Sequence, residues 1–178
     1  MSKALLAVVL TGAMAVLGAR KAGAVGEGER QLSGLVGFAL AEDGAARPGV
    51  QGAVEGALGL SEAWAARATF SVSLHPASGS QPHRQFSALT LGFTYAFDVL
   101  RLVPFVDLGL TVADVRTGGA DSRQRLGPQG GLGLEYLLSR RWAVAALARA
   151  EYLGLRLGGA SEPQPWLVIA GVRLGWIF

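Results

Sequence analysis

Apolar and polar residues alternate along almost the whole chain after residue 31, and this two-residue period is typical of β-strands. In the run 64–74, for example, Trp64, Phe70 and Leu74 fall on one face while Arg67 and Ser71 fall on the other. A strand of about ten residues is long enough to cross a bilayer at a tilt of about 45°. The alternation predicts eight such strands, at 32–41, 50–60, 64–74, 89–97, 102–113, 128–138, 142–155 and 166–178. Only the alanine-rich run 142–155 suits a helix equally well.

The connections between these runs also alternate in length. Short turns are predicted around Glu62, at 98–101 and at 139–140, and long loops at 42–49, 75–85, 114–127 and 156–165. Short turns at one end and long loops at the other are typical of outer-membrane barrels. We therefore predict an all-β fold, an eight-stranded antiparallel up-and-down transmembrane barrel.

The charged residues within the predicted strands all fall on the less apolar face. A soluble barrel would turn that face to water and display more charges on it, whereas a membrane barrel encloses it in a narrow lumen. Near-balance of opposite charges is what such an interior requires, because an unpaired buried ion is costly. The predicted lumen ion-pair network consists of Glu55, Arg67, Asp107, Glu135, Arg149, Glu151 and Arg173.

Counting residues back from the predicted turns gives a first estimate of the register. The turn at Glu62 places Arg67 opposite Ala57, one diagonal step from Glu55. The turn at 139–140 places Glu135 opposite Ala145 and level with Arg173 on the next strand. Such pairs fit either a rigid plug or a gated ion path, and the narrow interior of eight strands favours the plug.

Aromatic residues fall near both predicted rims on the apolar face. One rim holds Trp64, Phe97, Tyr136, Trp142, Trp176 and Phe178, and the other holds Phe38, Tyr152 and Trp166. Rings at both headgroup levels form the aromatic girdles of membrane barrels. The alternative is the ordinary enrichment of aromatic residues in strands.

Residues 1–24 have the features of a secretory signal peptide, with Lys3 first, an uncharged run at 4–19, and a small-x-small site at Ala22-Gly23-Ala24. The uncharged run is shorter than the roughly 20 residues of a membrane-spanning helix. Cleavage leaves a short segment at 25–31 and the barrel at 32–178.

Removing the leader also changes the charge of the protein. The leader holds three of the 16 basic side chains and none of the 13 acidic ones, so the mature chain is balanced and gives no support to nucleic-acid binding. Both lysines lie in the leader. The chain has no cysteine, which excludes disulfides and cysteine metal sites.

Few residues indicate catalysis or cofactor binding. The stretch Gly131-Leu132-Gly133 lies inside a predicted strand and lacks the third glycine of a dinucleotide fingerprint. Two histidines without clustered carboxylates make a poor metal site. We expect no cofactor and no bound metal.

The second predicted loop carries both histidines, His75 and His83. With Ser71, Ser73 and Ser78 nearby they offer a base and a nucleophile, as in barrels that modify lipid A, although the spacing matches no known motif.

The third predicted loop carries arginines beside two aspartates. Arg116, Arg123 and Arg125 either bind lipopolysaccharide phosphates or are simply solvated.

The closing run alternates Trp166, Val168, Ala170, Val172, Leu174 and Trp176, and ends in Phe178. This run is similar to the C-terminal assembly signal of Gram-negative outer-membrane proteins, and the mature chain resembles the small OmpA/OmpX-type barrels over nearly its whole length. The resemblance implies export through the periplasm, recognition of the last strand by the assembly machinery, and a place among outer-membrane lipids. We expect a monomeric, non-enzymatic protein with a structural or surface-interaction role. A narrow channel and a lipid A-modifying enzyme using His75 are the alternatives.

Overall fold

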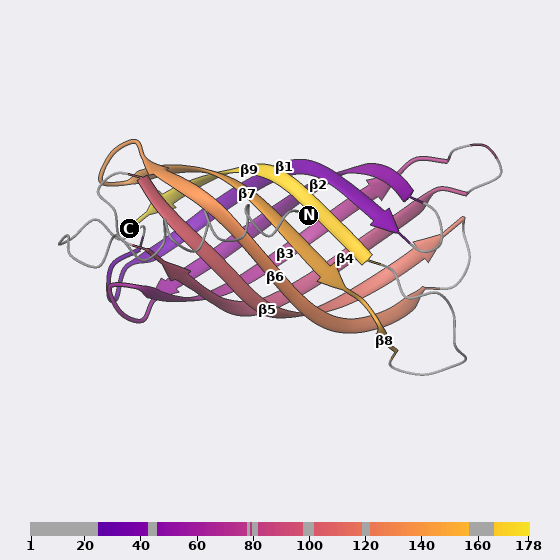
Figure 1. The fold of residues 1–178 in the computed structure, drawn as a ribbon, viewed down its shortest axis with the longest axis horizontal. Coiled ribbons are helices and arrows are strands. Elements are labelled where there is room, and N and C mark those ends of the chain that lie inside the picture. Colours follow the sequence, from indigo (N-terminus) through magenta and orange to yellow (C-terminus); the bar gives the residue numbers. More distant parts are fainter. Residues whose placement is uncertain are drawn as a thin grey trace, which may run out of the picture.

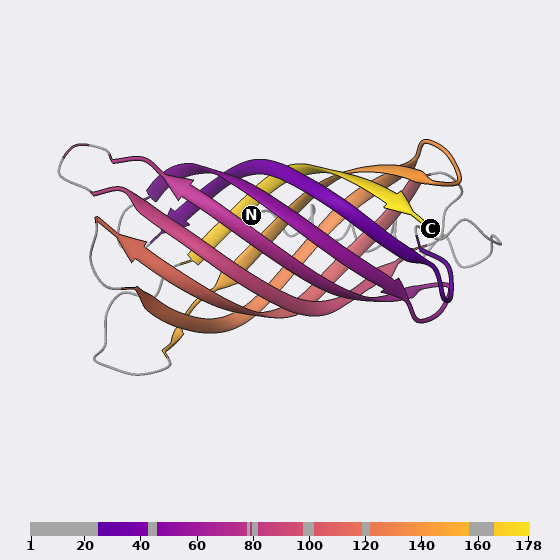
Figure 2. The ribbon, with the colours of Figure 1, turned by 180° about the vertical axis from the view of Figure 1, so that it is seen from behind.

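The computed structural model describes residues 25–42, 46–77, 79, 82–97, 102–118, 122–156 and 166–178. The strands within this part of the chain are β1 (Arg30–Glu42), β2 (Ala46–Gly59), β3 (Trp64–His75), β4 (Arg84–Ala96), β5 (Leu102–Thr117), β6 (Arg123–Leu137), β7 (Trp142–Tyr152), β8 (Leu155–Arg156) and β9 (Trp166–Ile177). Each long strand pairs antiparallel with its neighbour in sequence, and β1 pairs with β9 to close the sheet (Figures 1 and 2). The two-residue strand β8 pairs with β6. The prediction of an all-β, eight-stranded antiparallel barrel is confirmed.

The strands are longer than predicted at one end of the barrel. β5 runs to Thr117 and β6 begins at Arg123, so most of the loop predicted at 114–127 is strand. Likewise only residues 43–45 separate β1 from β2, which makes the predicted loop at 42–49 wrong. The alternation of apolar residues fades there because the outward positions are polar, Arg116 and Gln124 among them. By contrast, β7 ends at Tyr152, before the predicted end at residue 155.

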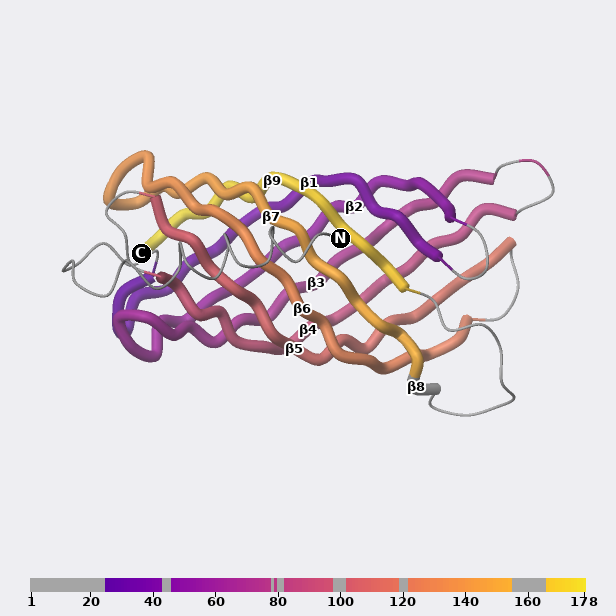
Figure 3. Tube along the Cα trace, viewed as in Figure 1, coloured from indigo at the N-terminus to yellow at the C-terminus, as the bar shows by residue number. Residues whose placement is uncertain are grey.

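The two ends of the barrel differ in their connections. The connections at 60–63 and 138–141 lie at one end of the barrel together with the C-terminus, and we call this the turn end and the opposite end the loop end (Figure 1). The strands are steeply tilted to the long axis of the molecule, as the trace in Figure 3 shows. The predicted signal peptide at 1–24 lies outside the described residues.

Side chains alternate between the two faces of the sheet. The outward face is apolar, with Val36 at 69%, Leu108 at 66% and Leu132 at 63% exposed, while inward side chains are buried. Among the described residues, no helix is long and apolar enough to cross a membrane. An exposed apolar belt of this size is a surface that requires a partner other than water.

Buried apolar side chains pack in both halves of the lumen. In the loop half, Phe86, Leu153, Leu167 and Ile169 pack with small residues of β1, β4 and β5 into a buried apolar cluster. A second cluster, which includes Leu35, Phe105, Ala145 and Leu147, packs nearer the turn end. Most of the buried charged residues lie in this turn half, whereas Arg125 and Glu151 lie in the loop half, in register with Ala113 and Leu167 of the first cluster.

Pairs of inward-facing glycines allow the strands to approach closely. Gly37 of β1 lies opposite Gly171 of β9, and Gly92 of β4 lies opposite Gly109 of β5. A Cβ atom on Gly37 would lie 2.5 Å from the carbonyl oxygen of Ala170. Gly37 and Gly171 therefore permit close approach at the β1–β9 seam, where the barrel closes, and Gly92 and Gly109 permit it between β4 and β5.

Candidate functional site: the lumen network

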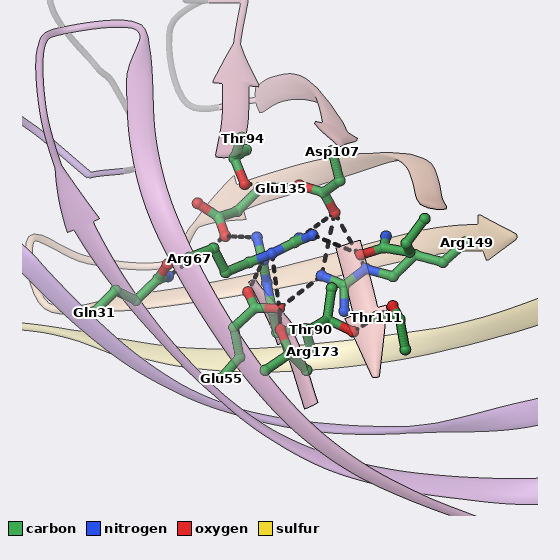
Figure 4. A network of polar contacts seen from close by, with 12 residues as sticks. Gln31, Glu55, Arg67, Thr90, Thr94, Asp107, Thr111, Glu135, Arg149 and Arg173 are labelled. Carbon is green, nitrogen blue, oxygen red and sulfur yellow. Dashed lines mark hydrogen bonds and ion pairs between the residues drawn. The ribbon is translucent and has the colours of Figure 1, made fainter. Parts of the chain in front are cut away.

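Glu55 is the centre of a buried cluster of ion pairs that we call the lumen network, made of Glu55, Arg67, Asp107, Glu135, Arg149 and Arg173 (Figure 4). Arg173 donates through Nη1 to Oε1 of Glu55 at 2.5 Å. Arg149 donates through Nη2 to Oε2 of the same carboxylate at 2.6 Å. The Nε atom of Arg67 lies 3.6 Å from that oxygen, so one carboxylate contacts all three arginines.

The other two acids complete the pairing. Asp107 forms ion pairs with Arg67 and, at 3.1 Å, with Arg149. Glu135 accepts a hydrogen bond of 2.6 Å from Nη2 of Arg173. Three arginines thus face three carboxylates within the lumen network, and every charged side chain of the network has an opposite charge within contact distance. Balance of this kind compensates much of the cost of removing the charges from water.

Uncharged polar side chains extend the network to the remaining strands. Thr69 donates to Glu55 at 3.0 Å, and Thr94 of β4 donates to Asp107 at 2.7 Å. Gln31 of β1 lies 3.5 Å from Glu135. Because the charged members come from β2, β3, β5, β6, β7 and β9, these contacts join all eight long strands across the lumen (Figure 4).

The structure places six of the seven predicted network residues together and leaves one apart. Glu151 is buried, but no ion pair within 4 Å is seen between it and the described residues, and its Oε2 has no hydrogen-bond partner among them. It lies opposite Gln129 on β6, two positions along β7 from Arg149 and towards the loop end. The arginines of the lumen network are already paired by the other three acids.

Two of the predicted register positions match the structure. Arg67 lies opposite Ala57, and Glu135 lies opposite Ala145, which pairs in turn with Arg173. The main partner of Arg67 is nevertheless Asp107 rather than the diagonal Glu55. Sequence analysis missed Gln129, which accepts a hydrogen bond of 3.3 Å from Arg67, and missed Thr94. Their position on the inward face was the available signal.

His75 lies in a different environment from the one predicted. It is the last residue of β3 rather than a loop residue, and its side chain is buried in the lumen. Its Nδ1 donates to the carbonyl oxygen of Arg47 at 2.9 Å, and its ring packs edge-on against Phe86. Nε2 has no hydrogen-bond partner among the described atoms, and the same is true of the Ser73 hydroxyl.

The other histidine and serine candidates lie apart from His75 or outside the described residues. His83 is exposed between β3 and β4, and Ser78 is outside the described residues. Ser71 is buried on the inward face of β3.

Two of the arginines assigned to the third loop belong to β6. Arg123 is its first residue and is exposed, while Arg125 is buried on the inward face, so it does not face outer-leaflet phosphates. Arg116 is on β5 and pairs with Asp114 at 3.1 Å, with its side chain 64% exposed. Arg116 is therefore exposed on the outward face of β5, whereas Arg123, in register with the inward-facing Val115, is exposed where β6 begins at the loop end.

The aromatic residues gather in small clusters at the two ends. At the turn end, Trp64 contacts Tyr95, Tyr95 contacts Phe97, and Trp176 contacts Phe178. Tyr136 and Trp142 are also exposed at this end. At the loop end, Phe38 is exposed and Tyr152 contacts Trp166. Sequence analysis left Tyr95 out of the girdle, although its ring joins Trp64 and Phe97.

Comparison with known proteins gives similarity in structure only. No protein-family model and no curated protein matches this chain. The structure of Neisserial surface protein A superposes with a TM-score of 0.65 at 18% identity, covering 83% of this chain and 99% of that one. Ail, the attachment invasion locus protein of Yersinia pestis, gives 0.58 at 14% identity over 85% and 99%. The outer-membrane enzyme PagL gives 0.52 at 14% identity over 82% and 97%. The chain therefore has the fold of the small eight-stranded β-barrels of the bacterial outer membrane.

Proposed function

We propose that this protein is a closed outer-membrane barrel with a structural or surface-interaction role, and that it neither conducts ions nor catalyses a reaction. The observation that carries the proposal is the neutral lumen network, in which each charged side chain contacts an opposite charge. A conducting pore requires a water-filled path, whereas here arginine and carboxylate side chains contact one another across the interior.

The apolar cluster in the loop half supports the same conclusion. Phe86, Leu167 and Ile169 are each at most 1% exposed and meet in the lumen with the alanines of β1, β4 and β5. Apolar side chains therefore occupy part of the lumen in this half, beside the buried Arg125 and Glu151. Together with the lumen network they support a closed interior.

A surface role is supported by the proteins that share the fold. Ail is named for attachment and invasion, and its structure is also known in complex with the heparin analogue sucrose octasulfate, with a TM-score of 0.56 to this chain. Arg116 and Arg123 are both exposed at the loop end of this chain. Guanidinium groups suit phosphate and sulfate by bidentate hydrogen bonding, so lipopolysaccharide and sulfated polysaccharides are the partners we propose for this end.

An enzymatic role is not supported by the position of His75. The ring lies inside the lumen against Phe86, facing away from the belt that meets lipid. No hydrogen bond joins it to Ser71 or Ser73 among the described contacts. His75 also borders an open hollow of about 560 Å³ with Phe38, Val50 and Leu74, but among the described residues no serine or carboxylate hydrogen-bonds to its ring. PagL, which shares the fold, is an outer-membrane enzyme.

Conductance recording in planar bilayers tests the closed lumen. We expect the purified protein, Glu55→Ala and Arg67→Ala all to give no discrete current steps, because side chains still fill the lumen. An open porin in the same bilayers is the positive control. Steps in the unmodified protein whose size changes in Glu55→Ala would overturn the proposal.

Mass spectrometry of lipid A from cells that express the protein tests the alternative that the protein is a lipid A-modifying enzyme. We expect the lipid A spectrum to match that of cells without the protein. A new lipid A species that disappears in His75→Ala would show that the protein is an enzyme.

A further inference from the structure

The residues that precede β1 fold back over the turn end of the barrel. The side chain of Val25 is buried, whereas Glu27, Gly28 and Glu29 are exposed. Val25 lines a small cavity of about 30 Å³ together with Glu55, Phe105 and Arg173. The side chain of Val25 therefore covers the lumen network on the side that faces the turn end.

A tight turn directs Val25 into this position. The amide of Glu29 donates to the carbonyl oxygen of Gly26 at 3.0 Å, and Gly28 has a φ of +78°. A positive φ at the third residue of a turn is typical of type II and favours glycine. The turn therefore reverses the chain just before β1 and directs its start towards the barrel.

Gly59, at the end of β2, holds the turn against the sheet. Its carbonyl oxygen accepts from Gly28 N at 3.0 Å, and its amide donates to the Glu29 carbonyl oxygen at 2.9 Å. A Cβ atom on Gly59 would overlap the carbonyl oxygen of Gly26. Position 59 therefore requires glycine for the segment to close over the barrel.

The Glu29 side chain points back to the start of the described chain. Its Oε2 accepts a hydrogen bond of 2.8 Å from the amide of Gly26, the residue after Val25. The small-x-small pattern Ala22-Gly23-Ala24 ends at the residue before Val25. A carboxylate thus lies one residue from the position at which cleavage would create a positive charge.

We propose that the peptide bond between Ala24 and Val25 is the processing site, and that the α-ammonium group released there pairs with Glu29 to hold Val25 as a plug. A membrane-bound peptidase selective for small residues would supply the hydrolysis. Water adds across the bond, its hydroxyl going to the Ala24 carbonyl carbon and its hydrogen to the Val25 nitrogen, which then takes up a proton. In this proposal, the segment 25–29 reaches its final fold only after the bond between Ala24 and Val25 is cleaved.

The composition of the chain provides a direct assay. Both lysines, Lys3 and Lys21, lie before Val25, so a chain that starts at Val25 has a single amine, its own N-terminus. An acylating reagent reacts only with the neutral amine. At a pH below the pKa of the amine, an ion pair that raises this pKa by one unit slows acylation about tenfold. Intact mass identifies the first residue and counts the acyl groups at the same time.

We expect protein extracted from the outer membrane to begin at Val25 and to take up one acyl group. The folded protein should react about three- to tenfold more slowly than protein unfolded in urea. Glu29→Gln keeps an acceptor for the Gly26 amide but loses the charge, and should react several-fold faster than the folded wild type. Glu62→Gln removes an exposed acid from the neighbouring 60–63 turn and should leave the rate unchanged.

Three results would overturn the proposal. They are a mass that places the first residue elsewhere, equal rates in folded and unfolded protein, and a rate in Glu29→Gln equal to that of the folded wild type. If Glu29→Gln does not assemble, Glu29→Asp keeps the charge on a shorter side chain and should remain slow relative to its own unfolded form. The closed lumen does not depend on the result, because conductance tests the network and this assay tests the N-terminus.

Discussion

Glu55 determines the electrostatic balance of the interior at the scale of single residues. Its carboxylate contacts Arg67, Arg149 and Arg173, and its side chain is 1% exposed. Removing it leaves three buried guanidinium groups to be balanced by Asp107 and Glu135 alone. Asp114, which pairs with the exposed Arg116, provides a matched comparison within the same protein.

We expect Glu55→Ala to lower the free energy of unfolding by about 3–5 kcal/mol, the cost of breaking a buried ion pair. Asp114→Ala should lower it by about 0–1 kcal/mol, because exposed pairs contribute little. Urea titration of the protein refolded in lipid vesicles, followed by tryptophan fluorescence, measures both. Equal midpoints for the two variants would contradict the role given to Glu55.

The contacts of single residues were predictable only where short turns fix the register. Arg67 opposite Ala57 and Glu135 opposite Ala145 follow from counting back from turns of four residues. The contacts across the lumen, such as Arg149 with Glu55, depend on strand tilt and stagger. Strand tilt and stagger are set by the closure of the whole barrel, so they cannot be predicted from the sequence of a single strand.

At the scale of strands, the seam between β1 and β9 depends on glycine. Gly37 and Gly171 lie opposite each other with no room for a Cβ atom on either, whereas Gly34 on the outward face of β1 has no atom within 4 Å of an added Cβ. Position 37 of β1 therefore requires glycine, whereas position 34 has room for a larger side chain.

We expect Gly37→Ala to destabilise the barrel by about 1–3 kcal/mol, as overpacking does. Gly34→Ala should be neutral or slightly stabilising, because alanine restricts the unfolded chain. The fraction that migrates as folded protein on unheated gels across a urea series gives both values. A loss in Gly34→Ala as large as that in Gly37→Ala would argue against close packing at the seam.

Strand existence was predictable and strand ends were not. The alternation of apolar residues is sustained only where an outward side chain meets the apolar belt, as Leu108 does. Beyond the belt, β5 and β6 continue with Arg116, Arg123 and Gln124. Their backbone pairing persists without an apolar signal, so an analysis of periodicity ends each strand too early. His75 and Arg125 were assigned to loops for the same reason.

At the scale of the whole molecule, the outward belt defines which surface meets lipid. Leu108 is 66% exposed in the middle of β5, whereas Leu60 is 49% exposed in the turn that follows β2. Both are large apolar residues on the outside of the protein, but only the first lies at mid-belt.

We expect Leu108→Arg to destabilise the protein in vesicles by about 2–4 kcal/mol and Leu60→Arg by about 0–1 kcal/mol, following the dependence on bilayer depth. Urea titration in vesicles of fixed lipid composition measures the difference. Equal effects at the two positions would mean that Leu108 does not face hydrocarbon.

The order in which the charges of the lumen network occur along the chain has a consequence for assembly. Glu55 belongs to the second strand, but two of its arginines, Arg149 and Arg173, arrive with β7 and β9. A chain inserted only as far as β6 would enclose a carboxylate deprived of most of its counter-charge. We expect such a form to be less stable than the complete barrel, because the final strand supplies both a missing cation and the closing edge.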